Sequence, residues 1–272
     1  MRVALYGLGR MGSHHARHLG ELGHEVHVVD PAKGRAEPPV PPDAVVVASP
    51  TGTHAEVALP WLERGVPVLV EKPVAATLGE ARALARHPRC FVGQVERFNP
   101  AFRALGTPGA RFLQAERLAP WADRGIDVDV VLDLMVHDLD LFAALCPAPV
   151  REVRANGLSL VSGRIDIVHA RVELEDGAVG LFTASRVSRR SARTLRVFAP
   201  GGYWSADLKA GTLVHVAPDL TESVVPVEPG DALRAELVAF LAAAAGDGSF
   251  PVRAADALPV LELAERIRCA CS

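Results

Sequence analysis

Low net charge and a shortage of cysteine are the first features of this 272-residue chain. A net charge of −3 argues against nucleic acid or an anionic membrane surface as the main partner. The cysteines are Cys90, Cys146, Cys269 and Cys271, and they form no C-x-x-C pair. Their spacing therefore suits neither a zinc site nor a redox motif, and we expect no bound metal and free thiols.

Long apolar runs and a leader segment are also missing. No apolar stretch reaches membrane-spanning length, and the N-terminus lacks the basic region and cleavage site of a signal peptide. Together with the free thiols, these absences predict a cytoplasmic protein with no membrane partner. The hydrophobic content of 49% is enough to bury a sizeable core, in one large domain or two modest ones.

The first hundred residues alternate between short apolar segments and helical patterns. Strands are expected at residues 2–6, 25–29, 44–48, 67–70 and 90–95, and helices at 13–22, 54–64 and 78–86. The proline-rich residues 33–42 cannot hold a full helix. This alternation predicts an α/β Rossmann domain with a parallel, doubly wound sheet, over residues 1–98.

The pattern changes after residue 109, where strands follow one another. They are expected at residues 111–118, 150–160, 166–174, 179–186, 193–199, 203–208 and 212–216, and helices at 130–145, 232–245 and 254–270. Glu175-Asp176-Gly177 reads as a hairpin turn between two of these strands. We therefore expect residues 99–272 to form an α+β domain with a largely antiparallel open sheet that binds substrate and mediates oligomerisation.

The first strand runs into a G-x-G-x-x-G motif made by Gly7, Gly9 and Gly12, with Arg10 and Met11 between the last two. In a strand–turn–helix context this motif binds a dinucleotide. Gly7 permits the tight turn, Gly9 lets backbone N–H groups approach a pyrophosphate, and Gly12 lets the helix pack close to the strand. The helix N-terminus favours the phosphate charge. The alternative is a glycine turn in an α/β domain that binds no cofactor.

Polar residues follow the next two strands. Asp30 comes about 20 residues after the glycine motif, where an acidic group holds the ribose hydroxyls of NAD and disfavours NADP. Ser49, Thr51 and His54 follow the strand at residues 44–48 and are candidates for cofactor contacts. The competing interpretation is a helix cap made by Thr51 or Thr53.

Two further strand ends carry charged side chains. Glu71 and Lys72 follow the strand at residues 67–70, and Pro73 restricts Lys72 to an extended conformation. Ligands bind at the carboxyl ends of parallel strands, so Glu71 and Lys72 are candidates for cofactor contacts, and Lys72 also for a substrate contact. Arg97 and Asn99 follow the last strand of the first domain. Arg97 is suited to bidentate binding of a carboxylate or phosphate, and its alternative is an interdomain salt bridge.

The expected helix at residues 130–145 is apolar on nearly every side but carries Asp133, His137 and Asp140. Asp133 and His137 are four residues apart and share a helix face, which Asp140 continues. A polar stripe on a buried helix is either an internal network or the lining of a cavity, and we favour the cavity. Trp121, in the loop before this helix, is either a sugar-stacking residue or a packing residue.

These motifs together resemble the Gfo/Idh/MocA family of nicotinamide-dependent oxidoreductases. The matching segments are the glycine motif, Pro50-Thr51 with His54, Glu71-Lys72-Pro73, and Asp133-x-x-x-His137. The resemblance implies hydride transfer between NAD, less readily NADP, and a secondary alcohol on a sugar. Lys72 would hold the substrate hydroxyl, and His137 would act as acid/base with the help of Asp133. A histidine is suited to that task at neutral pH.

Within the family, the segments around Arg97-Phe98-Asn99 and His137-Asp138 resemble the UDP-N-acetylglucosamine 3-dehydrogenase branch. Arg97, Asn99, Trp121, Asp133 and His137 are accordingly expected to contact substrate. The resemblance also implies a homodimer or homotetramer joined through the open sheet.

One departure from the family is plain: only twelve residues separate Asp30 from Asp43, where the family has a helix and a further strand. A βα unit is therefore missing on the adenosine side. Two other functions remain open, a dinucleotide-binding redox regulator without turnover and a reductase of imines or tetrapyrroles. The joint presence of Lys72, Asp133 and His137 favours the alcohol dehydrogenase over both.

Overall fold

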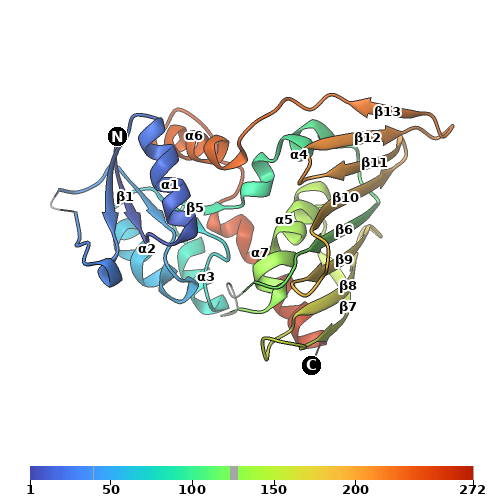
Figure 1. Ribbon diagram of the computed structural model, residues 1–272, viewed down its shortest axis with the longest axis horizontal. Coiled ribbons are helices and arrows are strands. Elements are labelled where there is room, and N and C mark those ends of the chain that lie inside the picture. Colours follow the sequence, from blue (N-terminus) through green and yellow to red (C-terminus); the bar gives the residue numbers. More distant parts are fainter. Residues whose placement is uncertain (39, 123–127, 272) are drawn as a thin grey trace. The chain divides into compact units, whose positions relative to one another are not determined.

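Short, wholly apolar segments build the first sheet of the protein. The computed structural model describes residues 1–38, 40–122 and 128–271 (Figure 1). Five parallel strands lie in the order β2-β1-β3-β4-β5. They are β1 (Arg2–Tyr6), β2 (Glu25–Val29), β3 (Ala44–Val47), β4 (Val68–Glu71) and β5 (Cys90–Gly93). Every residue of β3, β4 and β5 is buried, as expected for parallel strands covered on both faces.

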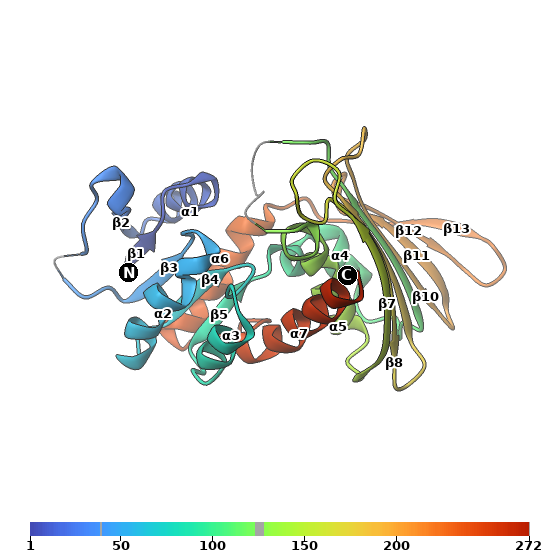
Figure 2. The ribbon, with the colours of Figure 1, turned by 90° about the horizontal axis from the view of Figure 1, so that it is seen from below.

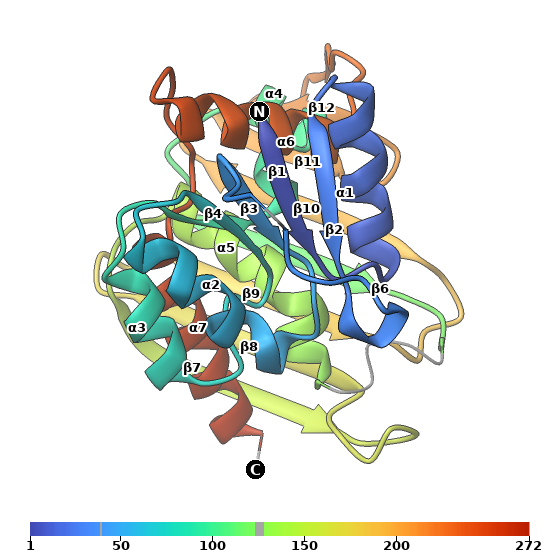
Figure 3. The same cartoon turned by 90° about the vertical axis from the view of Figure 1, so that its left-hand side faces the viewer.

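Two pairs of helices pack on this sheet (Figure 3). They are α1 (Arg10–Glu21) beside α6 (Ala232–Ala245), and α2 (His54–Glu63) beside α3 (Leu78–Ala85). Helix α3 begins with a capping box, in which Thr77 Oγ1 accepts from the Glu80 backbone N–H and the Glu80 carboxylate accepts from Thr77 N–H. The predicted Rossmann architecture is confirmed.

The missing βα unit is confirmed as well. After β2 the chain makes only a short 3-10 turn at Pro31–Lys33 before it reaches β3, which pairs directly with β1. Strand β2 therefore lies at the edge of the sheet. Asp30 and Arg35 exchange backbone hydrogen bonds, and the Tyr6 hydroxyl donates to Glu37. These contacts fasten the proline-rich link to the sheet.

By their contacts, Met1–Val95 and Asp231–Pro259 form one compact unit, and Glu96–Gly230 and Val260–Ser272 form the other. The later segment joins the first unit because Val92 N–H donates to the Val252 carbonyl and the ring of Phe91 packs against Phe240 and Phe250. The sequence predicts two domains with continuous ranges, residues 1–98 and 99–272, and these bounds stay a prediction.

The second unit is built on an eight-stranded sheet in the order β13-β12-β11-β10-β6-β9-β8-β7. All neighbours are antiparallel except β6 and β9, which run parallel. The strands are β6 (Phe112–Leu118), β7 (Val150–Leu158), β8 (Ile167–Leu174), β9 (Val179–Ser185), β10 (Ala192–Ala199), β11 (Gly202–Asp207), β12 (Thr212–Val216) and β13 (Glu222–Val225). Gly177, at φ +82°, makes the predicted turn between β8 and β9.

One face of this sheet is covered by helices (Figure 2). Residues along β6 alternate between half-buried and buried, so one face packs inward. On that side lie α4 (Pro100–Leu105) and α5 (Val136–Leu145), and the rings of Phe142 on α5 and Phe182 on β9 pack together. The predicted α+β architecture with a largely antiparallel open sheet is confirmed. The division between the two units falls within α7 (Ala254–Ala270).

Three elements differ from expectation. The helix expected at residues 130–145 begins as a π-helical turn at Val131–Met135 before α5 continues it. Helix α4 and strand β13 were not expected: α4 is very short, and β13 is a mostly exposed edge strand without an apolar run. Within the described part of the chain, no helix is long and apolar enough to cross a membrane.

Candidate active site

The glycine turn after β1 is closely packed on two sides and open on the third. A Cβ atom at Gly7 would lie 2.7 Å from the Ala48 carbonyl oxygen, and one at Gly12 would lie 1.9 Å from the Gly7 carbonyl oxygen. A Cβ at Gly9 would meet nothing within 4 Å. Gly9 is the N-cap of α1 and has no side chain to cap it. The turn therefore leaves room for a phosphate group at the helix N-terminus.

This turn lies at the point where the strand order reverses. Strands β1 and β3 are neighbours, and the chain leaves them in opposite directions, toward β2 and β4. In doubly wound sheets the carboxyl ends of such strands form the ligand-binding crevice. The close approach of Gly7 to Ala48 and Ser49 shows that the two loops meet there.

Asp30 ends β2 on the same edge of the sheet. Its Oδ2 accepts the backbone N–H of Leu8 at 2.9 Å, which places the carboxylate directly beside the glycine turn. The Lys33 ammonium group donates to the Leu8 carbonyl, so a basic side chain lies next to the acidic one. A hollow of about 400 Å³ adjoins Asp30, lined by residues of β2 and the link that follows (Val29, Pro31, Gly34, Arg35, Ala36 and Glu37). This hollow lies at the short link that takes the place of the βα unit.

His54 connects two strand-end loops. Its Nε2 lies 2.9 Å from the Ser49 carbonyl oxygen, and its Nδ1 lies 3.0 Å from the Pro73 carbonyl oxygen. Burial lowers the pKa of His54, and the two carbonyl acceptors act in the opposite direction. Both ring nitrogens thus contact backbone, so a direct contact with the cofactor stays a prediction. Ser49 Oγ bonds to Thr53 Oγ1 at 2.8 Å, and neither Thr51 nor Thr53 caps α2 through its side chain.

Glu71 and Lys72 follow directly at the end of β4. Glu71 is buried: its Oε1 lies 2.7 Å from Nε2 of His15 on α1, and its Oε2 accepts the Lys72 backbone N–H at 3.2 Å. Lys72 is half-buried, and its peptide bond to Pro73 is cis. The structure gives Glu71 an internal role next to Lys72, and its contact with the cofactor stays a prediction.

Asp133 and His137 lie in the second unit, around the π-helical turn. Asp133 is within the turn and half-buried, whereas His137 is on α5 with 9% of its surface exposed. A π turn takes more residues per turn than an α-helix, so it redirects the side chains that precede α5, and such turns are frequent at functional sites. Sequence spacing alone does not reveal this irregularity.

Asp140 belongs to an internal ion pair, so the cavity interpretation is wrong for this residue. Both of its carboxylate oxygens accept hydrogen bonds from the Arg97 guanidinium group, at 2.5 and 3.0 Å. Arg97 therefore makes a bidentate contact, but with a carboxylate of its own unit and not with a ligand, which is closer to the salt-bridge alternative. Its expected contacts with cofactor and substrate stay predictions.

A buried ion network was not predicted from the sequence. Arg117 on β6 lies between Glu96, at 2.7 Å, and Asp138 on α5, at 2.7 Å, and all three are nearly inaccessible to solvent. Burial raises the pKa of Asp138, and the charge of Arg117 opposes this. Asp138 and Asp140 both follow His137 on α5, so their ion pairs with Arg117 and Arg97 hold this helix in position. An isolated arginine in an alternating strand gives no sequence signal for such a role.

Asn99 has a structural role in this unit. Its Oδ1 caps α4 by accepting the Ala101 N–H at 3.1 Å, and its Nδ2 donates to Glu96 Oε2 and the Leu208 carbonyl. Trp121 is half-buried in the loop after β6, next to residues outside the described ranges. The substrate contacts expected of both residues stay predictions.

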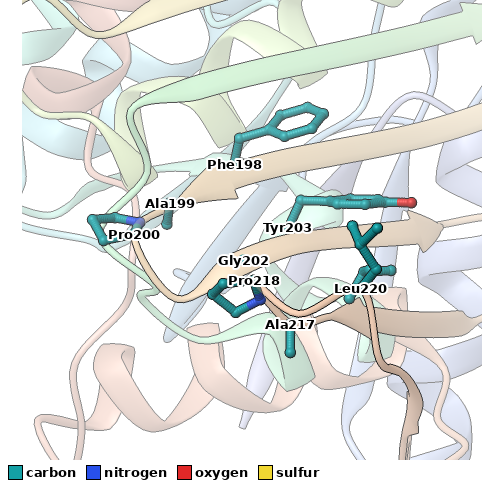
Figure 4. Close-up of a pocket in the computed structure, with 9 residues that line it drawn as sticks. Phe198, Ala199, Pro200, Gly202, Tyr203, Ala217, Pro218 and Leu220 are labelled. Atoms are coloured by element: carbon teal, nitrogen blue, oxygen red, sulfur yellow. The ribbon is translucent and has the colours of Figure 1, made fainter.

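A hollow of about 290 Å³ lies elsewhere on the second unit, between the ends of β10, β11 and β12 (Figure 4). Phe198, Tyr203 and Leu220 line it, together with small residues and prolines. It contains none of the expected site residues. Among the described residues, no group of three or more His, Cys, Asp or Glu side chains is arranged to hold a metal ion.

A Rossmann sheet with an open glycine turn and an acidic strand end, followed by a unit with a largely antiparallel sheet, defines the class of nicotinamide-dependent dehydrogenases. The profile described as "Oxidoreductase family, NAD-binding Rossmann fold" matches residues 36–89, and that of the "GFO/IDH/MocA C-terminal domain" matches residues 92–204. The chain belongs to the Gfo/Idh/MocA oxidoreductase family, and its cofactor is NAD.

Among curated relatives, UDP-N-acetylglucosamine 3-dehydrogenase from Acidithiobacillus ferrooxidans is 35% identical over 278 aligned positions, which cover 90% of this chain and 89% of the relative. Myo-inositol dehydrogenase Hyg17 from Streptomyces leeuwenhoekii is 32% identical, over 68% of this chain and 70% of its own. A solved structure of the Acidithiobacillus enzyme superimposes with a TM-score of 0.92 and 33% identity, covering 99% of this chain and 97% of that one.

Proposed function

We propose that this dehydrogenase oxidises a secondary hydroxyl of a nucleotide sugar, namely the 3-hydroxyl of a UDP-linked aminosugar, with NAD as hydride acceptor. The observation that carries the proposal is the likeness to the UDP-N-acetylglucosamine 3-dehydrogenase, which extends over both units of the chain at 35% identity. The inositol dehydrogenases are less similar: two are 27% and 32% identical over 69% and 68% of the chain, and a third is 29% identical over 90% of it.

Oxidation of a carbinol removes two groups, a hydride from carbon and a proton from oxygen. NAD supplies the hydride-accepting ring when it is bound. In the proposal, the Lys72 ammonium group donates a hydrogen bond to the substrate oxygen, and His137 accepts the hydroxyl proton as the general base. Asp133 stabilises the imidazolium ion that forms. The proposal requires Lys72 and His137 to reach the same oxygen in the productive complex.

Arginine side chains are the proposed contacts for the diphosphate, because their planar donors match phosphate oxygens. The Arg97 fork is already held by the buried Asp140. Arg190, in the turn before β10, and Arg193, near the start of β10, have side chains that are 72% and 52% exposed, and their ion pairs with Glu116 and Glu96 are longer, at 3.3 and 3.5 Å. We therefore assign the diphosphate to this turn. Replacing Arg193 with Gln should raise KM for a UDP-sugar and leave KM for a free sugar unchanged.

The proposal is tested by following reduced nicotinamide by its absorbance with four substrates: UDP-N-acetylglucosamine, UDP-glucose, free N-acetylglucosamine and myo-inositol. Turnover of UDP-N-acetylglucosamine with a higher kcat/KM than that of the free sugar supports it. Equal kcat/KM for the free and the UDP-linked sugar would contradict it. Preferred turnover of myo-inositol would assign the enzyme to the inositol dehydrogenases instead.

A further inference from the structure

Three ionisable side chains of the first unit meet in its interior, behind Lys72. Glu71 comes from β4, His15 from α1 and Glu236 from α6. His15 and Glu236 are fully buried, and Glu71 is 7% exposed. Neither the glycine motif nor the polar residues at the strand ends account for a buried glutamate on α6.

The hydrogen bonds of His15 indicate which of its ring nitrogens carries a hydrogen. Its Nε2 lies 2.7 Å from Glu71 Oε1, whereas its Nδ1 is buried and has no hydrogen-bond partner among the described residues. An imidazolium ion would leave a buried N–H unpaired at Nδ1, which is costly. The neutral ring with the hydrogen on Nε2 satisfies the contact, so His15 donates to Glu71 and Glu71 carries the negative charge.

Glu236 is in a different situation. Neither of its carboxyl oxygens has a hydrogen-bond partner among the described residues, and both are buried. A carboxylate without partners is very costly in the protein interior, and a second negative charge beside Glu71 adds repulsion. Burial accordingly raises the pKa of Glu236 well above its ordinary value, and the charge of Glu71 acts in the same direction.

The basic groups of the described residues that are seen to contact α6 do so at its two ends. The elements next to α6 include α1, β4 and β5. Helix α1 contacts α6, Phe91 on β5 packs against Phe240, and the charge of Glu71 on β4 acts on Glu236. Their titratable or charged groups near α6 are His15 and His18 of α1, Glu71 of β4, and Cys90 and Arg89 at the start of β5. His18 is 3.2 Å from Asp231 at the start of α6, and Arg89 donates to the Ala244 carbonyl at its end. Both therefore act at the helix ends, away from Glu236.

We propose that Glu236 is a positioning residue that acts through Glu71: a buried carboxylic acid that keeps its proton at neutral pH, so that a single negative charge lies behind Lys72. Glu71 links Glu236 to Lys72 because its Oε2 accepts a hydrogen bond from the Lys72 backbone N–H. With one charge instead of two in the interior, less negative potential opposes loss of the Lys72 proton. This inference rests on the proposed role of Lys72 in the reaction.

The first test needs no substrate. Unfolding of the protein is measured by denaturant from pH 5 to 8 for wild type, Glu236→Gln and Glu236→Leu. The folded protein binds the Glu236 proton more tightly than the unfolded chain, so wild type should lose stability relative to both variants as the pH rises, by up to about tenfold in the folded-to-unfolded ratio per pH unit. Glu56→Gln, at an exposed site on α2, is the matched control and should run parallel to wild type. Parallel curves for the Glu236 variants would overturn the proposal.

The second test reads the charge at Lys72. The rate at which an amine-acylating reagent modifies Lys72 is measured at pH 7 by mass spectrometry. Glu71→Gln, which removes the charge, should raise the rate, whereas Glu236→Gln should leave it unchanged because the wild-type side chain is already neutral. A similar rise in both variants would show that Glu236 is ionised and would overturn the proposal. If both results hold but Lys72→Met retains full turnover, the protonation of Glu236 stands and the proposed function of Lys72 fails.

Discussion

At the scale of single residues, the candidate site depends on side chains at strand ends and on one helix. Lys72 follows β4, and its backbone N–H donates to the carboxylate of Glu71, which also contacts His15. His137 is almost fully buried on α5, and two carboxylates that follow it on the same helix are engaged in ion pairs. The proposed function assigns to these two side chains the acid and the base that removal of a hydroxyl proton requires.

Replacing His137 with Ala or Lys72 with Met is expected to lower turnover by roughly 10²–10⁴-fold, the range for the loss of a positioned acid or base. NAD affinity should change far less, because the glycine turn and Asp30 remain. Steady-state kinetics and calorimetric NAD titration separate the two effects. Normal turnover in both variants would show that the assigned mechanism is wrong.

Asp30 is expected to make NAD bind more tightly than NADP, because its carboxylate accepts hydrogen bonds from ribose hydroxyls and repels a 2′-phosphate. Asp30→Ser should weaken NAD binding by about 1.5–3 kcal/mol, the range for hydrogen bonds to a charged group. Lys33→Met removes the neighbouring cation and should widen the preference for NAD. Calorimetric titration with both cofactors measures this, and tighter binding of NADP to wild type would refute it.

At the scale of elements, two kinds of contact hold the site in place. Close backbone packing of α1 against the glycine turn leaves no room for a side chain at Gly12. Buried ion pairs join α5 to β6 and to the segment before α4. Each arrangement is sensitive to the loss of one partner, because nothing else fills the space or neutralises the charge.

Gly12→Ala is expected to displace α1 from the glycine turn, since the new Cβ would lie 1.9 Å from the Gly7 carbonyl oxygen. Stability should fall, and NAD affinity should fall with it. Gly20→Ala in the same helix is the matched control, because its Cβ meets nothing within 4 Å. It should stabilise the protein by about 0.5–1 kcal/mol through helix propensity. Thermal unfolding with and without NAD measures both variants, and equal stability of the two would rule out this packing argument.

Arg117→Met should destabilise the second unit by about 3–5 kcal/mol, because it leaves the buried carboxylate of Asp138 without its ion-pair partner and leaves Glu96 only the more exposed Arg193, 3.5 Å away. The control is Arg190→Met, which breaks the exposed pair with Glu116 on the same sheet. That change should cost at most about 1 kcal/mol. Denaturant unfolding measures both, and a similar small loss in Arg117→Met would mean that the network contributes little to stability.

At the scale of the whole molecule, the eight-stranded sheet leaves a face on which no helix of the described part of its own unit packs (Figure 2). The rings of Phe112, Phe198 and Tyr203 cluster there, with centroids 5.7 and 5.2 Å apart, and all three are half-buried. Leu220 and Val224, at the β12–β13 hairpin, are 79% and 80% exposed. Apolar surface of this kind usually marks a site of association.

We expect a homodimer or homotetramer joined through this sheet. Tyr203→Glu should shift the protein toward smaller species, because a charge would then lie within the interface. Val238→Glu, at an exposed site on α6, is the control and should leave the assembly unchanged. Light scattering at micromolar concentration measures the mass. A wild-type monomer under these conditions would contradict the prediction.

The sequence by itself determined the order of nearly all elements and the class of each unit. Apolar runs such as Ala44–Val47 and alternating segments such as Phe112–Leu118 carry their periodicity in a few neighbouring residues. The glycine turn and the missing βα unit could also be predicted from the sequence, because turn geometry and segment length are local properties. The short helix α4 and the edge strand β13 lacked such a local pattern.

Only the tertiary structure decided which polar side chains face each other. Asp140 pairs with Arg97, and Arg117 joins Glu96 to Asp138, across large separations in the sequence. The charge of Glu71 acts on Glu236 although the two residues are 165 positions apart in the chain. The charge state of a buried group depends on these distant neighbours and on the loss of water around it, and neither is encoded in the local pattern.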